Sequence, residues 1–254
     1  MIDLVAAAFH AALATEGFPI LLVAVILAGL VRGFSGFGTA MIYMPFAGTV
    51  LPPVWAVITM LVFDIPGTMP ILRDALKDSH RKDLQRLIFG AVVALPFGLF
   101  LLSRVHPDVF RWSVSSISLV LLMVLITGWR YRGVLSRKMT VGVGAMGGFL
   151  SGASGVAGPP VILLYMSSRH AIQVIRANVL LYLFMIDALT LTIAGVMGLL
   201  DLVPISIGLI LTIPYALANM AGAALFRPDK EKLFRAVAYV LIAVSALSNL
   251  PLFG

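Results

Sequence analysis

Long apolar runs are the feature that most constrains this chain. A helix needs about 20 apolar residues to cross about 30 Å of hydrocarbon. Of the residues, 61% are hydrophobic and 11% are charged, whereas soluble globular domains carry about 25% charged residues. The pattern predicts an all-α polytopic membrane protein. Its eight apolar runs lie at residues 18–51, 54–72, 87–104, 112–129, 139–168, 177–199, 203–226 and 233–253.

The first and fifth runs are too long for one helix and too short for two. A glycine-rich motif interrupts each of them, at residues 29–38 and 148–158. The motifs are related, because the glycines and serine of the first recur at one constant offset in the second. The corresponding positions are Gly29, Gly33, Ser35 and Gly36 in the first motif and Gly148, Gly152, Ser154 and Gly155 in the second. We expect each run to form a re-entrant hairpin of two half-helices.

The chain is therefore expected to be a single transmembrane domain, residues 1–254, built from two repeats. Repeat one covers about residues 18–129 and repeat two about residues 139–253. Each would hold one hairpin followed by three transmembrane helices, giving six full spans and two hairpins, or eight spans if the hairpins are counted. Three crossings are an odd number, so the second repeat would enter from the opposite side. Such inverted-topology repeats are typical of secondary transporters.

The basic residues indicate an orientation. If both hairpins return to their own side, fifteen Lys and Arg residues lie in cytoplasmic loops and two, Arg104 and Arg111, lie outside. Both termini would then be outside. The net charge of +7 thus reports topology, and the expected environment is a lipid bilayer with no nucleic-acid partner. The first 17 residues lack the basic start of a signal peptide, so we expect the mature protein to keep them.

A hairpin that breaks inside the membrane points the N-terminus of its second half-helix into the protein. Unpaired backbone N–H groups and a partial positive charge make such an end an anion site. By the inverted symmetry, both ends would converge on one central site. The candidate substrate-binding residues are Arg32, Gly33, Ser35, Gly36, Phe37, Gly38, Thr39, Ser151, Ser154, Gly155, Gly158 and Asn178.

Arg32 is the one cation away from the ends of an apolar run, and its counterpart in the second motif is Ser151. A guanidinium offers a planar fork of donors that suits carboxylate, sulfonate or phosphate oxygens. The alternatives are an ion pair with Asp64 and snorkelling to the interface. The glycines also have an alternative role, since small residues allow helices to pack closely in membranes.

Asp64 and Asp187 each lie near the middle of the span after a hairpin. Either could carry a proton and couple anion movement to protons. The alternatives are a salt bridge for Asp64 and hydrogen bonds to Thr190 or Tyr182 for Asp187. The chain has no cysteine and its four histidines are scattered, so no metal and no other cofactor is expected.

Three other classes of protein are possible. Residues 152–155 fit the GxSG pattern of an intramembrane serine protease with Ser154 as nucleophile. That chemistry needs a histidine base beside the serine, and the histidines fall at loops or ends. An aspartyl intramembrane protease would pair Asp64 with Asp187. A passive assembly protein would leave Arg32 without a role. The transporter is the favoured class, and no enzyme activity is expected.

The paired motifs, the two-repeat layout and the size resemble the sulfite exporter TauE/SafE family of bacterial membrane transporters. The resemblance implies export of a small sulfur-containing anion, such as sulfite, sulfoacetate or a related organosulfonate. It also implies a bacterial cytoplasmic (inner) membrane, which would make both termini periplasmic. The residues that carry it are Gly29, Gly33, Phe34, Gly36, Phe37, Gly38 and Pro45 in the first half, and Gly148, Gly152, Gly155, Gly158 and Pro159 in the second.

Overall fold

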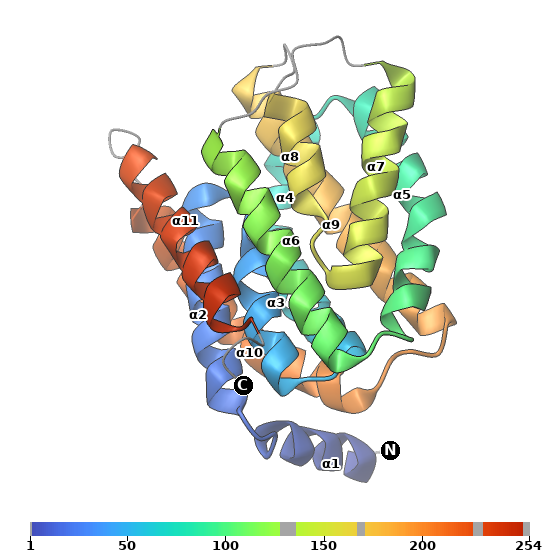
Figure 1. Cartoon of the computed structure of the whole chain (residues 1–254), viewed down its shortest axis with the longest axis vertical. Coiled ribbons are helices and arrows are strands. Elements are labelled where there is room, and N and C mark those ends of the chain that lie inside the picture. Colours follow the sequence, from blue (N-terminus) through green and yellow to red (C-terminus); the bar gives the residue numbers. More distant parts are fainter. Residues whose placement is uncertain (1, 128–135, 167–170, 226–230, 251–254) are drawn as a thin grey trace.

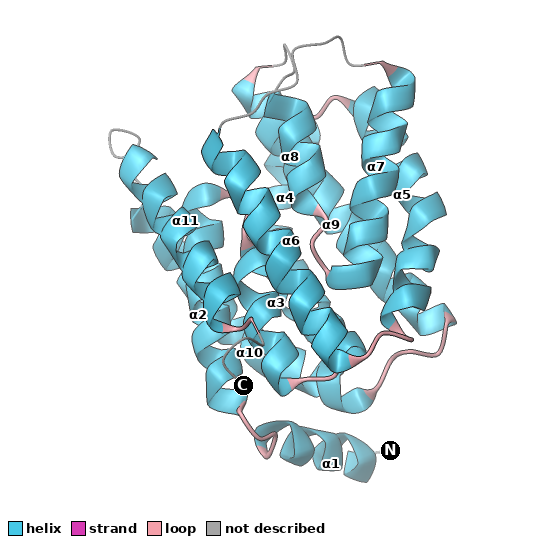
Figure 2. Ribbon diagram, in the orientation of Figure 1, coloured by secondary structure: helices cyan, strands magenta, loops and turns pink. Residues whose placement is uncertain are grey.

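The computed structural model is helical throughout the residues it describes, which are 2–127, 136–166, 171–225 and 231–250, with no strand among them (Figure 2). Figure 1 shows the helices as a bundle, with α1 lying across one end. The elements are α1 Ile2–Leu13, α2 Phe18–Ser35, α3 Thr39–Val50, α4 Pro53–Asp78, α5 Arg81–Leu102, α6 Pro107–Thr127, α7 Arg137–Ser154, α8 Gly158–Met166, α9 Ile172–Val196, α10 Leu202–Leu225 and α11 Glu231–Ser248.

Five helices are long and apolar enough to cross a membrane. Two shorter apolar helices, Pro53–Met69 and Leu233–Ser248, coincide with two further predicted spans. Large apolar side chains face outward, including Phe97 at 68% exposure and Met220 at 70%, as lipid contact requires. The chain is therefore a multi-pass membrane protein. The five long segments are Phe18–Ser35, Arg81–Leu102, Pro107–Thr127, Gln173–Val196 and Leu202–Leu225.

Both glycine motifs end a helix with the same backbone geometry. Gly36 has φ 77° and Gly155 has φ 74°, in the left-handed region that glycine tolerates best. The Gly36 amide donates to the carbonyl of Arg32, and the Gly155 amide donates to the carbonyl of Ser151. Each helix thus ends in a left-handed cap, and the chain starts a new helix after a short turn.

The first helix of each motif is longer than expected. α2 and α7 each contain 18 residues, about 27 Å at 1.5 Å per residue, so the expectation of half-helices is wrong for them. The second helices are short, with 12 residues in α3 and 9 in α8. In the first motif the break falls after Ser35, and Gly33, which is a predicted substrate ligand, stays helical.

The glycines before each break let two helix backbones approach closely. A Cβ at Gly33 would lie 2.2 Å from the carbonyl oxygen of Asn219 in α10. A Cβ at Gly152 would lie 2.5 Å from the carbonyl oxygen of Leu95 in α5. Side chains at these positions would push the pairs apart, so the packing role of the glycines holds here. The α2–α10 and α7–α5 contacts each join one half of the chain to the other.

The helices α4 and α9 also pack against each other. They carry Asp64 and Asp187, both of which are buried. The two helix breaks and these two aspartates are thereby brought to the same region of the bundle, where they line one cavity.

Candidate functional site

A cavity lies between the two helix breaks. Its volume is about 40 Å³, roughly the space of three water molecules. Eight of the fourteen substrate-binding and proton-coupling candidates line it. The lining comprises Arg32, Phe37, Gly38, Thr39, Ala40, Met41, Met60, Asp64, Gly155, Val156, Ala157, Gly158, Pro159, Ile162, Leu183 and Asp187.

Arg32 is the cation of this cavity. It lies in the last turn of α2 and is only 6% exposed. Its Nη2 atom is buried and has no hydrogen-bond partner among the described residues. The nearest carboxylate oxygen is Asp64 Oδ2 at 3.8 Å, which is an ion pair but is too long for a hydrogen bond. A buried donor without a partner is costly, so Arg32 is poised to bind an acceptor.

Asp64 is held by two hydroxyl groups from other helices. The Tyr215 hydroxyl in α10 donates to Asp64 Oδ1. The Thr39 hydroxyl lies 3.5 Å from the same oxygen and 3.1 Å from the Tyr215 hydroxyl. These contacts join α3, α4 and α10 around one carboxyl group. The guanidinium meets the other oxygen, Asp64 Oδ2.

Asp187 is the second acidic group of the cavity. It is 6% exposed and interacts with both Asp64 and Arg32. The site therefore holds one guanidinium and two carboxyl groups, all of them largely buried. Two carboxylates this close repel each other strongly in a medium of low dielectric.

Two helix N-termini face the cavity. α3 presents Thr39, Ala40 and Met41 after Gly38, whose φ of 101° opens the turn. α8 presents Gly158 and Pro159. Both ends bring the positive end of a helix dipole to the cavity. α8 supplies fewer N–H donors, because proline occupies its second and third positions.

The three predicted serine ligands all point elsewhere. The Ser35 hydroxyl lies 2.7 Å from the carbonyl oxygens of Val31 and Phe37 and stabilises the turn. Ser154 donates to the carbonyl of Leu150, one turn earlier in its own helix. Ser151 bonds Thr190 at 3.1 Å. None of the three lines the cavity, and neither do Gly33 and Gly36.

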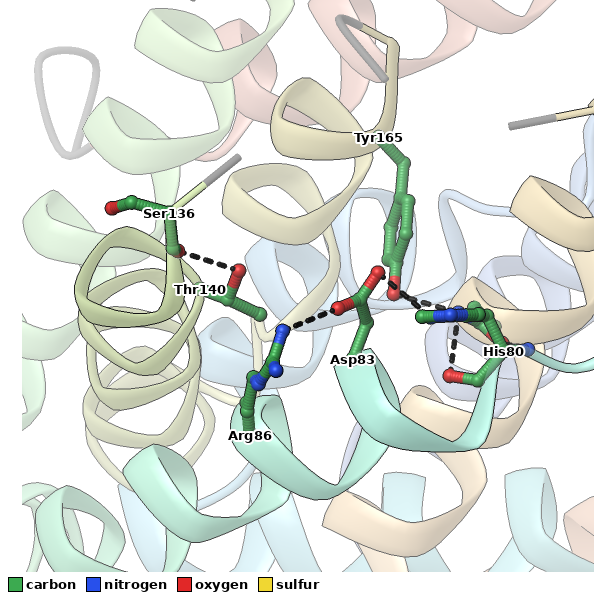
Figure 3. Close-up of polar contacts among 7 residues, drawn as sticks. His80, Asp83, Arg86, Ser136, Thr140 and Tyr165 are labelled. Atoms are coloured by element: carbon green, nitrogen blue, oxygen red, sulfur yellow. Dashed lines mark hydrogen bonds and ion pairs between the residues drawn. The ribbon is translucent and has the colours of Figure 1, made fainter. Parts of the chain in front are cut away.

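Asn178 also lies outside the cavity, at the far end of α8. Its side chain donates to the Tyr165 hydroxyl at 2.7 Å and accepts from the His80 amide at 2.8 Å. Close by, Asp83 pairs with His80 Nδ1 at 3.0 Å and with Arg86 at 3.1 Å. Figure 3 shows Asp83 between Arg86 and His80, with Tyr165 beside them. This network joins the α4–α5 connection to α8 and α9.

Tyr215 contacts Asp64 and Thr39 at the site but is not among the predicted ligands. Its only signal was its place after Pro214, in parallel with Phe97 after Pro96. The two positions differ in the structure, because Tyr215 is fully buried and Phe97 is 68% exposed. The apolar lining residues Met60 and Leu183 carried no recognisable signal.

The serine protease alternative gains no support. The Ser154 hydroxyl is bonded to its own helix, and the cavity lining contains no histidine among the described residues. His10 lies in α1, His80 precedes α5 and His106 precedes α6. The fourth histidine, His170, lies outside the described residues. So do basic loop residues such as 130, 132 and 169, and the side chain of Arg176, which count toward the predicted orientation.

Comparison with protein families gives one match that covers nearly the whole chain. The family described as sulfite exporter TauE/SafE matches residues 21–249. Comparisons with curated proteins and with solved structures found no match. The matched region contains both helix breaks, both buried aspartates and Arg32.

Proposed function

We propose that this chain, which belongs to the sulfite exporter TauE/SafE family of membrane transporters, binds a small sulfur-containing anion in the cavity between its two helix breaks. The observation that carries the proposal is the buried, unpartnered Nη2 of Arg32. An oxyanion supplies the acceptor that this donor lacks, and the guanidinium fork suits its geometry. The N-termini of α3 and α8 add favourable dipoles.

The anion class is sulfite, sulfoacetate or a related organosulfonate. The small cavity favours the compact member of this set, since about 40 Å³ corresponds to roughly three waters. A longer organosulfonate needs a wider conformation of the cavity. The apolar lining residues Met41, Met60 and Leu183 provide a flexible wall, because methionine adapts easily to shape.

In this proposal, Asp64 and Asp187 couple the movement of the anion to that of a proton. A proton on the carboxyl pair lowers the negative charge beside Arg32 and so favours anion binding. The proton and the anion then move in the same direction. A sulfite dianion with one proton carries a net charge of −1. An inside-negative potential favours its exit by about 2.3 kcal/mol per 100 mV, so the electrical part of the driving force favours export.

The membrane arrangement follows from the basic loops. Fifteen Lys and Arg residues lie in loops that we assign to the cytoplasm. This assignment makes the termini periplasmic in a bacterial inner membrane. The two halves are proposed as inverted repeats, and their matching left-handed caps at Gly36 and Gly155 support that relation.

Transport in proteoliposomes tests the proposal. Vesicles with the wild-type protein are expected to take up sulfite, and those with Arg32→Ala are expected to lose uptake while the protein stays folded by circular dichroism. Arg104→Ala is the matched control, since Arg104 is exposed and rests on the Phe100 ring. Wild-type uptake of sulfite, sulfoacetate and other organosulfonates equal to that of empty vesicles would refute the proposal.

A further inference from the structure

The contacts of Tyr215 explain why Arg32 Nη2 has no hydrogen-bond partner in the described part of the chain. Its hydroxyl donates to Asp64 Oδ1 and also contacts the Thr39 hydroxyl at 3.1 Å. One carboxylate oxygen of Asp64 is thereby occupied. The other oxygen reaches Arg32 Nη2 only at 3.8 Å, outside hydrogen-bond range.

The Tyr215 ring is fixed in place. It is fully buried and packs on Phe63 with a centroid distance of 4.8 Å. A Cβ at Gly67 would lie 2.6 Å from the ring edge, so the ring fills the space that this glycine leaves. Gly29 and Gly33 let α2 pack closely against α10. This packing fixes the position of Tyr215, in α10, relative to Arg32, in α2. The hydroxyl therefore has one position, and Asp64 is held by it.

Without this hydroxyl, Asp64 is free to turn toward the guanidinium. A buried carboxylate and an arginine prefer a short, two-point contact, and charge-assisted bonds of this kind are among the strongest in proteins. That contact occupies the donors that an anionic substrate needs. Internal pairing and substrate binding are thus competing uses of one guanidinium.

We propose that Tyr215 is a positioning residue, which holds Asp64 back from Arg32 and so keeps the guanidinium available to a bound oxyanion. The inference rests on the proposed function, because it assumes that Arg32 is the anion ligand. The corresponding positions in the two halves of the chain do not repeat this arrangement. Phe97, which follows Pro96 as Tyr215 follows Pro214, has no hydroxyl and is exposed, and the second motif has Ser151 in place of Arg32.

Equilibrium binding of sulfite to the purified full-length protein tests this role. Tyr215→Phe removes the hydroxyl and keeps the ring, and its dissociation constant is expected to rise about tenfold, as for the loss of one strong hydrogen bond. The double variant Tyr215→Phe with Asp64→Asn is expected to recover most of this loss, because the competing carboxylate is gone. If Tyr215 only supports the fold, Tyr215→Phe is expected to weaken binding by the same factor in the Asp64→Asn background as in the wild type.

Tyr43→Phe is the matched control. Tyr43 is fully buried, its hydroxyl lies 3.0 Å from the Thr59 hydroxyl, and its ring packs on the same Phe63. Its affinity is expected to equal that of the wild type. Asp64→Glu provides a second probe that leaves Tyr215 intact, since a longer carboxylate closes the 3.8 Å gap and is expected to weaken binding by a similar factor.

The outcomes are distinguishable. Absence of sulfite binding by the wild type would refute the proposed function itself. Wild-type binding with unchanged affinity in Tyr215→Phe would overturn the positioning role alone. If Tyr215→Phe does not fold, unchanged affinity in Asp64→Glu overturns it. A weakened Tyr215→Phe that Asp64→Asn fails to rescue would also overturn it.

Discussion

Arg32 Nη2 and Asp64 Oδ2 lie 3.8 Å apart, and both side chains are 6% exposed. A buried ion pair recovers its desolvation cost only when good hydrogen bonds complete it, and this pair has none between its members. The free energy of the folded site is therefore sensitive to anything that supplies the missing acceptor. A bound anion supplies this acceptor, and it stabilises the folded protein by mass action.

Arg32→Lys is expected to weaken sulfite binding about tenfold or more while retaining the positive charge. Lysine offers a point charge in place of a planar fork, so a two-point contact with an oxyanion is lost. Isothermal titration of the purified protein measures the change. Arg104→Lys, at an exposed position, is expected to bind like the wild type. Equal affinities for Arg32→Lys and the wild type would show that charge alone is recognised.

Asp187→Asn is expected to abolish the acceleration of sulfite uptake by an imposed inward proton gradient. The substitution keeps the side-chain shape but removes one of the two carboxyl groups of the cavity. Uptake driven by the anion gradient alone then becomes independent of the pH difference. Asp201→Asn is the control, because Asp201 is exposed and caps α10 through the Val203 amide, a role that asparagine fills equally well. A wild-type response in Asp187→Asn and Asp64→Asn would exclude both carboxyls from coupling.

Gly33→Ala is expected to destabilise the protein by about 1–3 kcal/mol, as overpacking does. Its new methyl would lie 2.2 Å from the Asn219 carbonyl oxygen and 2.6 Å from the Ala223 amide, and neither backbone atom can move alone. Gly142→Ala meets nothing within 4 Å and is expected to raise stability slightly through better helix propensity. Thermal unfolding in detergent compares the two. A midpoint for Gly33→Ala equal to that of the wild type would refute the packing role.

Sequence reasoning located the two helix breaks because glycine repeats at a fixed offset, and the caps at Gly36 and Gly155 follow that repeat. The residues at the cavity that could be found were the charged ones, since an intramembrane charge stands out in an apolar run. Arg32, Asp64 and Asp187 all line the cavity. Their spacing along the chain says nothing of their distances, which depend on how α2, α4 and α9 pack.

Two kinds of error have a physical cause. Ser154 was expected to face an anion, but a serine inside a helix readily bonds the carbonyl one turn back, as it does with Leu150. Gly33 was expected to bind the anion, although close packing against α10 explains this glycine better. Tyr215 was missed because its contact with Thr39 spans 176 residues. No local pattern encodes a contact of that range.

Asn178→Ala is expected to lower the free energy of unfolding by about 2 kcal/mol, because it removes hydrogen bonds that a buried side chain makes. Asn178 is fully buried and joins three parts of the bundle through the His80 amide and the Tyr165 hydroxyl. The loss is expected as a drop of several degrees in the unfolding midpoint, measured in detergent. Thr192→Ala removes a bond from an exposed hydroxyl to its own helix at Ala188 and is expected to change the midpoint little. Equal midpoints for the two variants would show that the Asn178 network adds nothing to stability.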